Sequence, residues 1–111
     1  MNTLLEKLNG LVARFEEVST LITDPNVIAD QQRYVRLTKE YKELEDLMAA
    51  RKEYANLLSN LEESKDMLLH ETDADMKEMA REEVAACEKR IPELEESIKL
   101  MLVPKDPEDS K

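Results

Sequence analysis

The feature that most constrains this chain is its lack of helix-breaking residues. Between Pro25 and Pro92 lie 66 residues without a single Gly or Pro, and Gly10 is the only glycine of the 111-residue chain. Gly and Pro are the residues that most often interrupt helices and form turns, so this stretch can hold long helices with few turns. Charged residues at 38% beside 41% hydrophobic residues also favour long amphipathic helices over a compact mixed fold.

The apolar residues predict a first helix over about residues 2–22. They recur at spacings of three and four, which is one stripe of an amphipathic helix. The stripe consists of Leu4, Leu8, Leu11, Phe15, Val18 and Ile22. Gly10 lies inside this run and costs about 1 kcal/mol relative to Ala. Either another helix approaches closely at this glycine or the helix tolerates the loss.

The next break is followed by a second, longer helix, expected over about residues 30–69. Pro25 stops the first helix, Asp24 can cap a short turn, and Asp30 is the N-cap expected for the long helix. Val27 and Ile28 lie between them as an apolar staple. The expected buried stripe is Tyr34, Leu37, Tyr41, Leu44, Leu47 or Met48, Tyr54, Leu57 or Leu58, Leu61 and Leu68.

A third helix is expected over about residues 74–102. Thr72 and Asp75 fit a capping box at its start, and Pro92 predicts a kink near residues 88–92. Its stripe keeps a rhythm close to the 3.5-residue repeat of a coiled coil. The members are Met76, Ala80, Val84, Cys87, Ile91, Leu94, Ile98 and Met101 or Leu102.

These elements define the expected fold class and domain. The turn between the second and third helices is short, and short loops join antiparallel neighbours. We therefore expect an all-α fold, in which a long antiparallel, coiled-coil-like hairpin carries a third, N-terminal helix packed on it. The helical domain would cover residues 1–102. Residues 103–111, with two prolines among charged residues, would be a linker towards downstream domains that this chain does not contain.

Charge and hydropathy exclude several classes. The net charge of −10 argues against tight binding of nucleic acid by the whole surface, although local basic contacts stay open. No apolar run is long enough to cross a membrane, and no signal peptide is recognisable, so we expect a cytoplasmic protein. One cysteine, Cys87, cannot form an internal disulfide.

Two sets of residues could have a chemical role, but a structural role is favoured for both. His70, Glu71, Asp73 and Asp75 could form a weak divalent-ion site, but they lack the pattern of a calcium loop and fit a capped, solvated turn better. Cys87 lies on an apolar stripe without an evident base, so a buried structural thiol is favoured over a nucleophile.

Charged and aromatic surface patterns offer further alternatives. From residue 62 to 96 the chain has 13 acidic and five basic residues, and these account for eight of its ten excess negative charges. This stretch is either a docking face for a basic partner or the solvated side of a hairpin.

Four basic residues of the long helix are expected to form surface ion pairs with Glu40, Glu43 and Glu45. Contact with RNA phosphates is the second option for them. The three tyrosines Tyr34, Tyr41 and Tyr54 are interpreted as core residues rather than base-stacking platforms. The basic residues are Arg33, Arg36, Lys39 and Lys42.

No catalytic, cofactor-binding or metal-binding residues can be assigned. The sequence shows no Gly-rich phosphate loop, no Ser/His/Asp set and no paired catalytic carboxylates. By residues alone this is a helical interaction module, not an enzyme, and its partner-binding residues stay unknown.

Three segments resemble the N-terminal helical domain of bacterial class I peptide chain release factors of type 1, the kind that reads UAA and UAG. Residues 28–41 resemble the opening of that domain's long helix, and residues 75–83 resemble the start of its next helix. The most specific segment is Leu102-Val103-Pro104-Lys105-Asp106-Pro107-Glu108-Asp109, which resembles the exit from that helix. Their order and spacing extend the resemblance over essentially the whole chain.

The resemblance implies a role in translation termination, with no cofactor. The whole factor would enter the ribosomal A site, read the stop codon of the mRNA through a Pro-x-Thr type loop, and promote peptidyl-tRNA hydrolysis through a methylated Gly-Gly-Gln loop. Neither motif occurs here, so no codon-reading or hydrolytic residue can be carried over. The implied partners of this arm are the stalk-base region of the ribosome, the class II release-factor GTPase and the glutamine methyltransferase.

Two other interpretations remain open at this point. The chain could be a free-standing coiled-coil adaptor or chaperone-like protein, or an oligomeric structural coiled coil. The first does not explain the Pro-Lys-Asp-Pro run, and the second predicts strong self-association through the long seam.

Overall fold

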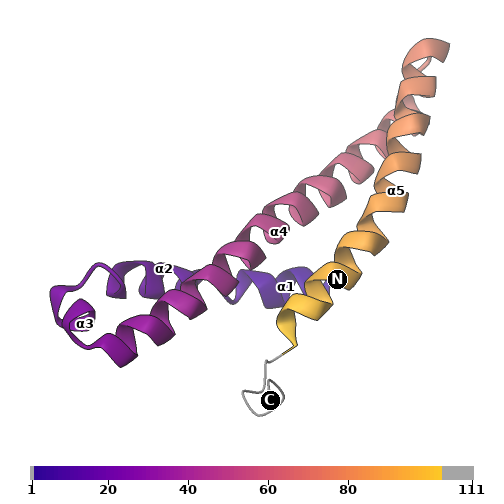
Figure 1. Ribbon diagram of the computed structural model, residues 1–111. Helices are drawn as coiled ribbons and strands as arrows, with labels where there is room; N and C mark the ends of the chain where they lie inside the picture. Colours follow the sequence, from indigo (N-terminus) through magenta and orange to yellow (C-terminus); the bar gives the residue numbers. More distant parts are fainter. Residues whose placement is uncertain (1, 104–111) are drawn as a thin grey trace. The chain divides into compact units, whose positions relative to one another are not determined.

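The computed structural model describes residues 2–103, which form five helices and no strand (Figure 1). The helices are α1 (Thr3–Asn9), α2 (Val12–Leu21), α3 (Pro25–Ala29), α4 (Gln31–His70) and α5 (Ala74–Leu102). The expected all-α class is confirmed. Within the described residues, no helix is both long enough and apolar enough to span a membrane.

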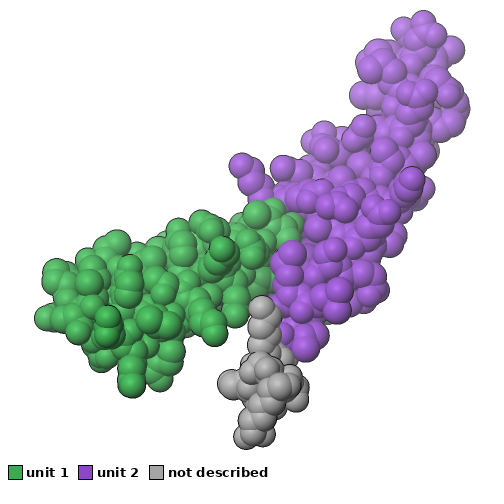
Figure 2. Space-filling view, in the orientation of Figure 1, with its two compact units in different colours: residues 1–51 green, residues 52–111 purple. Residues whose placement is uncertain are grey.

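The chain divides into two compact units, distinguished by colour in Figure 2. Unit 1 comprises residues 1–51 and unit 2 residues 52–111. The boundary falls inside α4, which continues as one helix from Gln31 to His70. Unit 1 therefore holds α1, α2, α3 and the first half of α4, and unit 2 holds the second half of α4 and α5.

Short polar side chains cap the starts of α1, α3 and α4, whereas α2 begins at Leu11 without a side-chain cap. The Asn2 side chain accepts a hydrogen bond from the Leu5 N–H at 2.9 Å, which satisfies one free donor at the start of α1. Asp24 does the same for α3 through the Asn26 N–H, with Pro25 in the first turn. Asp30 accepts from the Arg33 N–H at 3.3 Å at the start of α4. The predicted capping roles of Asp24 and Asp30 are confirmed.

The single helix expected over residues 2–22 was wrong, because the structure has two helices that are separated at Gly10 and Leu11. The backbone stays in the right-handed helical region at both residues. The hydrogen bonds tighten, however, since the Leu11 N–H donates to the Leu8 carbonyl three residues back, at 3.1 Å. Gly is the residue that favours such a break, since it has the highest conformational entropy to lose in a helix.

No neighbouring helix requires the glycine at this break. A Cβ added to Gly10 would meet only the carbonyl oxygens of Lys7 and Glu6, at 3.4 and 3.7 Å. These are ordinary contacts within the same turn. Of the two explanations open at Gly10, the structure therefore supports tolerance of the glycine rather than close approach of another helix.

Unit 1 has a core of aliphatic side chains from its helices. Its buried residues are Leu8, Val18, Val27, Leu37, Leu44, Leu47 and Ala50. At the edge of this core the ring of Phe15 on α2 stacks on that of Tyr41 on α4, with centroids 5.3 Å apart. Near the end of the unit, the Arg51 Nε–H donates to the Asn9 side-chain oxygen at 2.7 Å. The expected packing of the N-terminal segment on the long helix is confirmed.

Unit 2 is an antiparallel helical hairpin, as predicted (Figure 1). The second half of α4 and α5 are joined by residues 71–73. Asp73, not Thr72, caps α5, and its side chain accepts from the Asp75 N–H at 2.9 Å. The capping box predicted for Thr72 was therefore wrong by one residue, because Glu71 accepts from the Thr72 and Asp73 N–H groups and fixes the turn there.

The predicted stripe of α5 forms most of the core of unit 2. The fully or largely buried residues are Tyr54, Ala80, Cys87, Ile91, Leu94 and Ile98. Burial declines toward the turn, where Met76 is 38% and Leu69 80% exposed. Helix α5 continues through Pro92. Pro92 is exposed, so the helical hydrogen bond that it cannot donate is lost on the side of the helix that faces solvent.

The expected bounds of the second and third helices agree with α4 and α5 to within one residue. Val103 ends α5 with an extended backbone. The rest of the linker predicted over residues 103–111 lies outside the described residues.

Candidate docking surfaces

The polar residues at the turn of the hairpin are engaged in ending and starting helices. Besides the roles of Glu71 and Asp73, the His70 ring lies 3.3 Å from an Asp66 carboxylate oxygen one turn back on α4. Between residues 2 and 103, no three His, Cys, Asp or Glu side chains gather where they could hold a metal ion. The hydrogen bonds of Glu71 and Asp73 and the exposure of Asp73 and Asp75 give this cluster the arrangement of a capped, solvated turn.

Cys87 is buried in the seam between α4 and α5, with 1% of its surface exposed. Burial raises the pKa of the thiol, and the nearby Glu83 carboxylate, 3.6 Å from Sγ, raises it further. A protonated and buried thiol is a poor nucleophile. The structure thus gives Cys87 the packing role that its place on the stripe indicated.

The three tyrosines differ in how deeply they are buried. Tyr54 is completely buried, and its hydroxyl donates to a Glu95 carboxylate oxygen at 2.6 Å. Tyr41 stacks on Phe15, and Tyr34 is half-buried. The predicted core position is confirmed for Tyr54, whereas Tyr34 and Tyr41 are only half-buried.

The basic residues of α4 do not form the ion pairs predicted for them. Arg33, Arg36, Lys39 and Lys42 have no salt bridge to any described residue. Glu40, their expected partner, is bound instead by Arg14 of α2. Two N–H groups of Arg14 donate to the two Glu40 oxygens, each at 2.7 Å.

The Arg14–Glu40 pair links α2 to α4 through two hydrogen bonds. Arg14 also donates to Glu17, one turn along α2. The hydrogen bond from Arg14 holds the pKa of Glu40 below its usual value, and the two carboxylates raise the pKa of Arg14 above its own. Sequence reasoning missed this pair, because its partners are 26 residues apart and no local spacing connects them.

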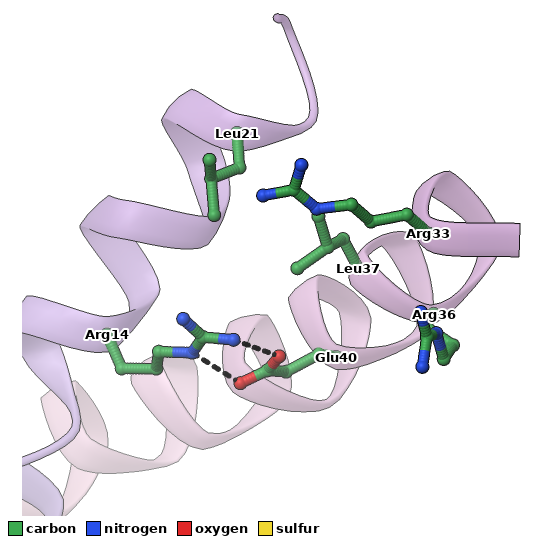
Figure 3. Close-up of a pocket in the computed structure, with 6 residues that line it drawn as sticks. All are labelled: Arg14, Leu21, Arg33, Arg36, Leu37 and Glu40. Atoms are coloured by element: carbon green, nitrogen blue, oxygen red, sulfur yellow. Dashed lines mark hydrogen bonds and ion pairs between the residues drawn. The ribbon is translucent and has the colours of Figure 1, made fainter. Parts of the chain in front are cut away.

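Beside this pair, unit 1 contains a polar pocket between α2 and α4 (Figure 3). Its volume is about 330 Å³. The described lining residues are Arg14, Leu21, Arg33, Arg36, Leu37 and Glu40. In Figure 3 Arg14 reaches across to Glu40, while Arg33 extends toward Leu21 near the end of α2. The pocket thus has three guanidinium groups and one carboxylate.

Unit 2 is strongly acidic. Of the 13 acidic residues between positions 62 and 96, all but Glu71 and Glu95 are exposed. Few of them are neutralised across the hairpin. A salt bridge outside this set of acids joins Arg90 of α5 to Glu53 of α4 at 2.8 Å, and it lowers the pKa of Glu53 and raises that of Arg90. A second link, Lys65 to Glu88, is long at 4.0 Å.

Apolar side chains are exposed close to the turn of this acidic hairpin. Met67 and Leu69 precede the turn on α4, and Met76 and Met79 follow it on α5. Flexible methionines suit surfaces that adapt to a partner. Exposed carboxylates, among them Asp66, Asp73 and Asp75, lie in the same part of the chain. We call the exposed acids of residues 62–96 and these four apolar residues the acidic tip surface.

The comparisons with known proteins agree on one family. The PCRF domain family matches residues 11–111. Over 99% of its length the chain is 71% identical to peptide chain release factor 1 of Bacteroides fragilis and 70% identical to that of Bacteroides thetaiotaomicron. It is 40% identical over its whole length to peptide chain release factor 1 of Lacticaseibacillus casei.

The chain spans about 30% of the length of these relatives. No solved structure matches it.

Proposed function

Because this chain belongs to the PCRF domain family, we propose that it is the N-terminal helical domain of a type 1 peptide chain release factor and acts in translation termination in the cytoplasm. The whole factor would recognise UAA and UAG on the ribosome and promote hydrolysis of peptidyl-tRNA. The observation that carries this proposal is the 71% identity to a relative named peptide chain release factor 1 over 99% of the chain.

The proposed part of this domain in termination is to dock the factor. The sequence holds neither a Gly-Gly-Gln nor a Pro-x-Thr motif, so codon reading and hydrolysis would belong to other parts of the factor. What the described residues offer is two stable helical units with distinct surface charge. A docking role uses these features without requiring a reactive group.

We assign the docking role to the acidic tip surface, with a basic protein of the ribosome as its partner. Its excess of exposed carboxylates would accelerate the approach of a basic surface by electrostatic steering. The exposed Met and Leu side chains would then add apolar contact area at close range. The stalk-base region of the ribosome, the class II release-factor GTPase and the glutamine methyltransferase are the partners proposed for such an arm.

The gene around this segment provides the first test. We expect the reading frame to continue after Lys111 into a region that encodes a Pro-x-Thr loop and a Gly-Gly-Gln loop. A frame that lacks both motifs would contradict the release-factor role and would favour a free-standing helical adaptor.

The docking role can be tested by rapid kinetics with the full-length factor and ribosomes paused at a UAA codon. Glu62, Glu63 and Glu82 are exposed and have no ion pairs, so their replacement by Gln removes charge without breaking contacts. We expect the triple variant to associate several-fold more slowly at low salt, by roughly tenfold at most, and the difference to vanish at high salt.

A matched control removes the same charge from unit 1. Glu16, Glu43 and Glu45 are also exposed and unpaired, and their triple Gln variant should associate at nearly the rate of the parent factor. Equal slowing by both triple variants would show that net charge, and not the acidic tip surface, governs association.

A further inference from the structure

Two arginines in unit 1 lack carboxylate partners although the chain carries ten excess negative charges. Arg33 and Arg36 make no ion pair with any described residue. Glu40 lies four residues after Arg36, at the spacing of a helical ion pair, but both its oxygens are occupied by Arg14. The Arg14–Glu40 pair therefore leaves two guanidinium groups available at the edge of one pocket.

These exposed guanidinium groups lie along a half-open pocket that also has apolar lining residues. Leu21 of α2 and Leu37 of α4 provide apolar walls, and Leu37 is buried. Apolar walls strengthen the interaction of a bound anion with the guanidinium groups, because they exclude part of the water that screens it. The volume of about 330 Å³ admits a small anionic group with part of the molecule that carries it.

The number of donors favours a phosphate group over a carboxylate. In the Arg14–Glu40 and Arg90–Glu53 pairs, the two oxygens of one carboxylate accept from a single guanidinium. A guest carboxylate bound in this way would offer the second arginine only its remaining lone pairs. A phosphate group has more acceptor oxygens, arranged tetrahedrally, and can bind two guanidinium forks at once.

We propose that the pocket of Arg14, Leu21, Arg33, Arg36, Leu37 and Glu40 binds a phosphate group of an RNA backbone. Arg33 and Arg36 donate to the phosphate oxygens, and Arg14 stays on Glu40 and holds the wall of the pocket in place. RNA as the source of the phosphate rests on the proposed ribosomal function. The acidic remainder of the chain repels a polyanion, so the contact is limited to one or two phosphates.

The pocket can be tested by NMR titration of the 111-residue chain labelled with ¹⁵N, in which the Nε–H signals of arginine side chains are resolved. The probes are inorganic phosphate, a short RNA hairpin, and acetate with an oligoglutamate peptide as carboxylate probes. We expect phosphate and the hairpin to shift the Arg33 and Arg36 signals saturably and the carboxylate probes to shift them far less. The affinity for the hairpin should fall with salt with a logarithmic slope of about −1 to −2.

Variants separate the pocket from general positive charge. The double variant Arg33→Gln/Arg36→Gln should lose roughly tenfold or more in affinity for the hairpin. Its control is Lys39→Gln/Lys42→Gln, which removes the same charge from exposed, unpaired residues of the same helix outside the described lining and should lose less than about twofold. Arg33→Lys/Arg36→Lys keeps the charge without the planar fork and should bind with intermediate affinity.

Three outcomes would overturn the proposal. Equal weakening by the arginine and lysine double variants would indicate diffuse charge instead of a site. Equal or stronger shifts with oligoglutamate would assign the pocket to an acidic protein. Binding of inorganic phosphate without binding of the hairpin would exclude RNA as the source. The titration contains no ribosome, so its failure leaves the proposed termination function to be judged by the gene sequence and the association kinetics.

Discussion

The buried hydroxyl of Tyr54 gives the sharpest test of how the hairpin is held together. Tyr54 lies on α4, is completely buried, and donates to Glu95 of α5 at 2.6 Å. That distance is typical of a hydrogen bond from a hydroxyl to a charged acceptor. Replacing Tyr54 by Phe removes the donor and keeps the ring, so the change isolates the hydrogen bond from the packing.

The expected loss follows from the state of the two partners. A hydrogen bond to a charged group contributes about 1.5–3 kcal/mol net. Glu95 is half-buried, and water can solvate its carboxylate once the hydroxyl is gone, so the loss should lie near the lower end. We expect the free energy of unfolding to fall by about 1.5 kcal/mol and the Tm by about 7 °C for a chain of this size.

Urea unfolding monitored by circular dichroism measures this change, and Tyr34→Phe is the matched control. Tyr34 is half-buried, and its hydroxyl has no hydrogen bond within the described residues, so this variant should change stability by less than about 0.5 kcal/mol. A double-mutant cycle of Tyr54→Phe with Glu95→Ala should give a coupling energy of about 1 kcal/mol. A coupling energy of zero would refute the assignment of the loss to this hydrogen bond.

Three further predictions concern Gly10, Glu40 and Cys87. Gly10→Ala should raise the free energy of unfolding by about 0.5–1 kcal/mol in urea, because the backbone is already helical and the added Cβ meets only ordinary contacts; a loss of stability would contradict this. The pKa of Glu40 is lowered from 4.5 by the hydrogen bond from Arg14, so the pair stabilises the fold above about pH 4.5 and the contribution is lost as the pH falls through the lowered pKa. Acid titration of stability should therefore show a shallower decline below pH 4.5 in Glu40→Gln than in the parent. Cys87 should react with a thiol reagent at pH 8 roughly a hundredfold or more slowly in the folded chain than in urea, and similar rates would contradict its burial.

The long helices could be predicted from the sequence because their signals are local and repeated. In α5 the buried residues Ala80, Cys87, Ile91, Leu94 and Ile98 all belong to the predicted stripe. Without Gly or Pro between positions 25 and 92, only the polar turn near residue 70 could separate the two helices. The spacing of the apolar residues and the positions of the helix-breaking residues therefore indicated the same two helices, and together they gave the bounds of these helices.

The features that escaped prediction depend on competition between neighbouring or distant groups. Thr72 and Asp73 are both able to cap a helix, and the choice between them depends on the hydrogen bonds that Glu71 makes with the turn. The break at Gly10 reflects a small free-energy difference of about 1 kcal/mol, which a continuous apolar stripe hides. Glu40 had several basic neighbours on its own helix, and only the tertiary structure shows that Arg14 of α2 is its partner.

That last competition also explains how an acidic chain can keep a cationic site. Unit 1 has nine acidic and seven basic residues, whereas unit 2 has 17 and nine. Most of the excess negative charge thus belongs to the hairpin, where salt bridges leave many carboxylates exposed. In unit 1, by contrast, two basic residues are left without an ion pair. Glu40 binds Arg14 and therefore does not pair with Arg33 or Arg36. The proposed attraction of unit 2 for a basic protein therefore follows from its excess of carboxylates, and the proposed attraction of unit 1 for a phosphate follows from the Arg14–Glu40 pair.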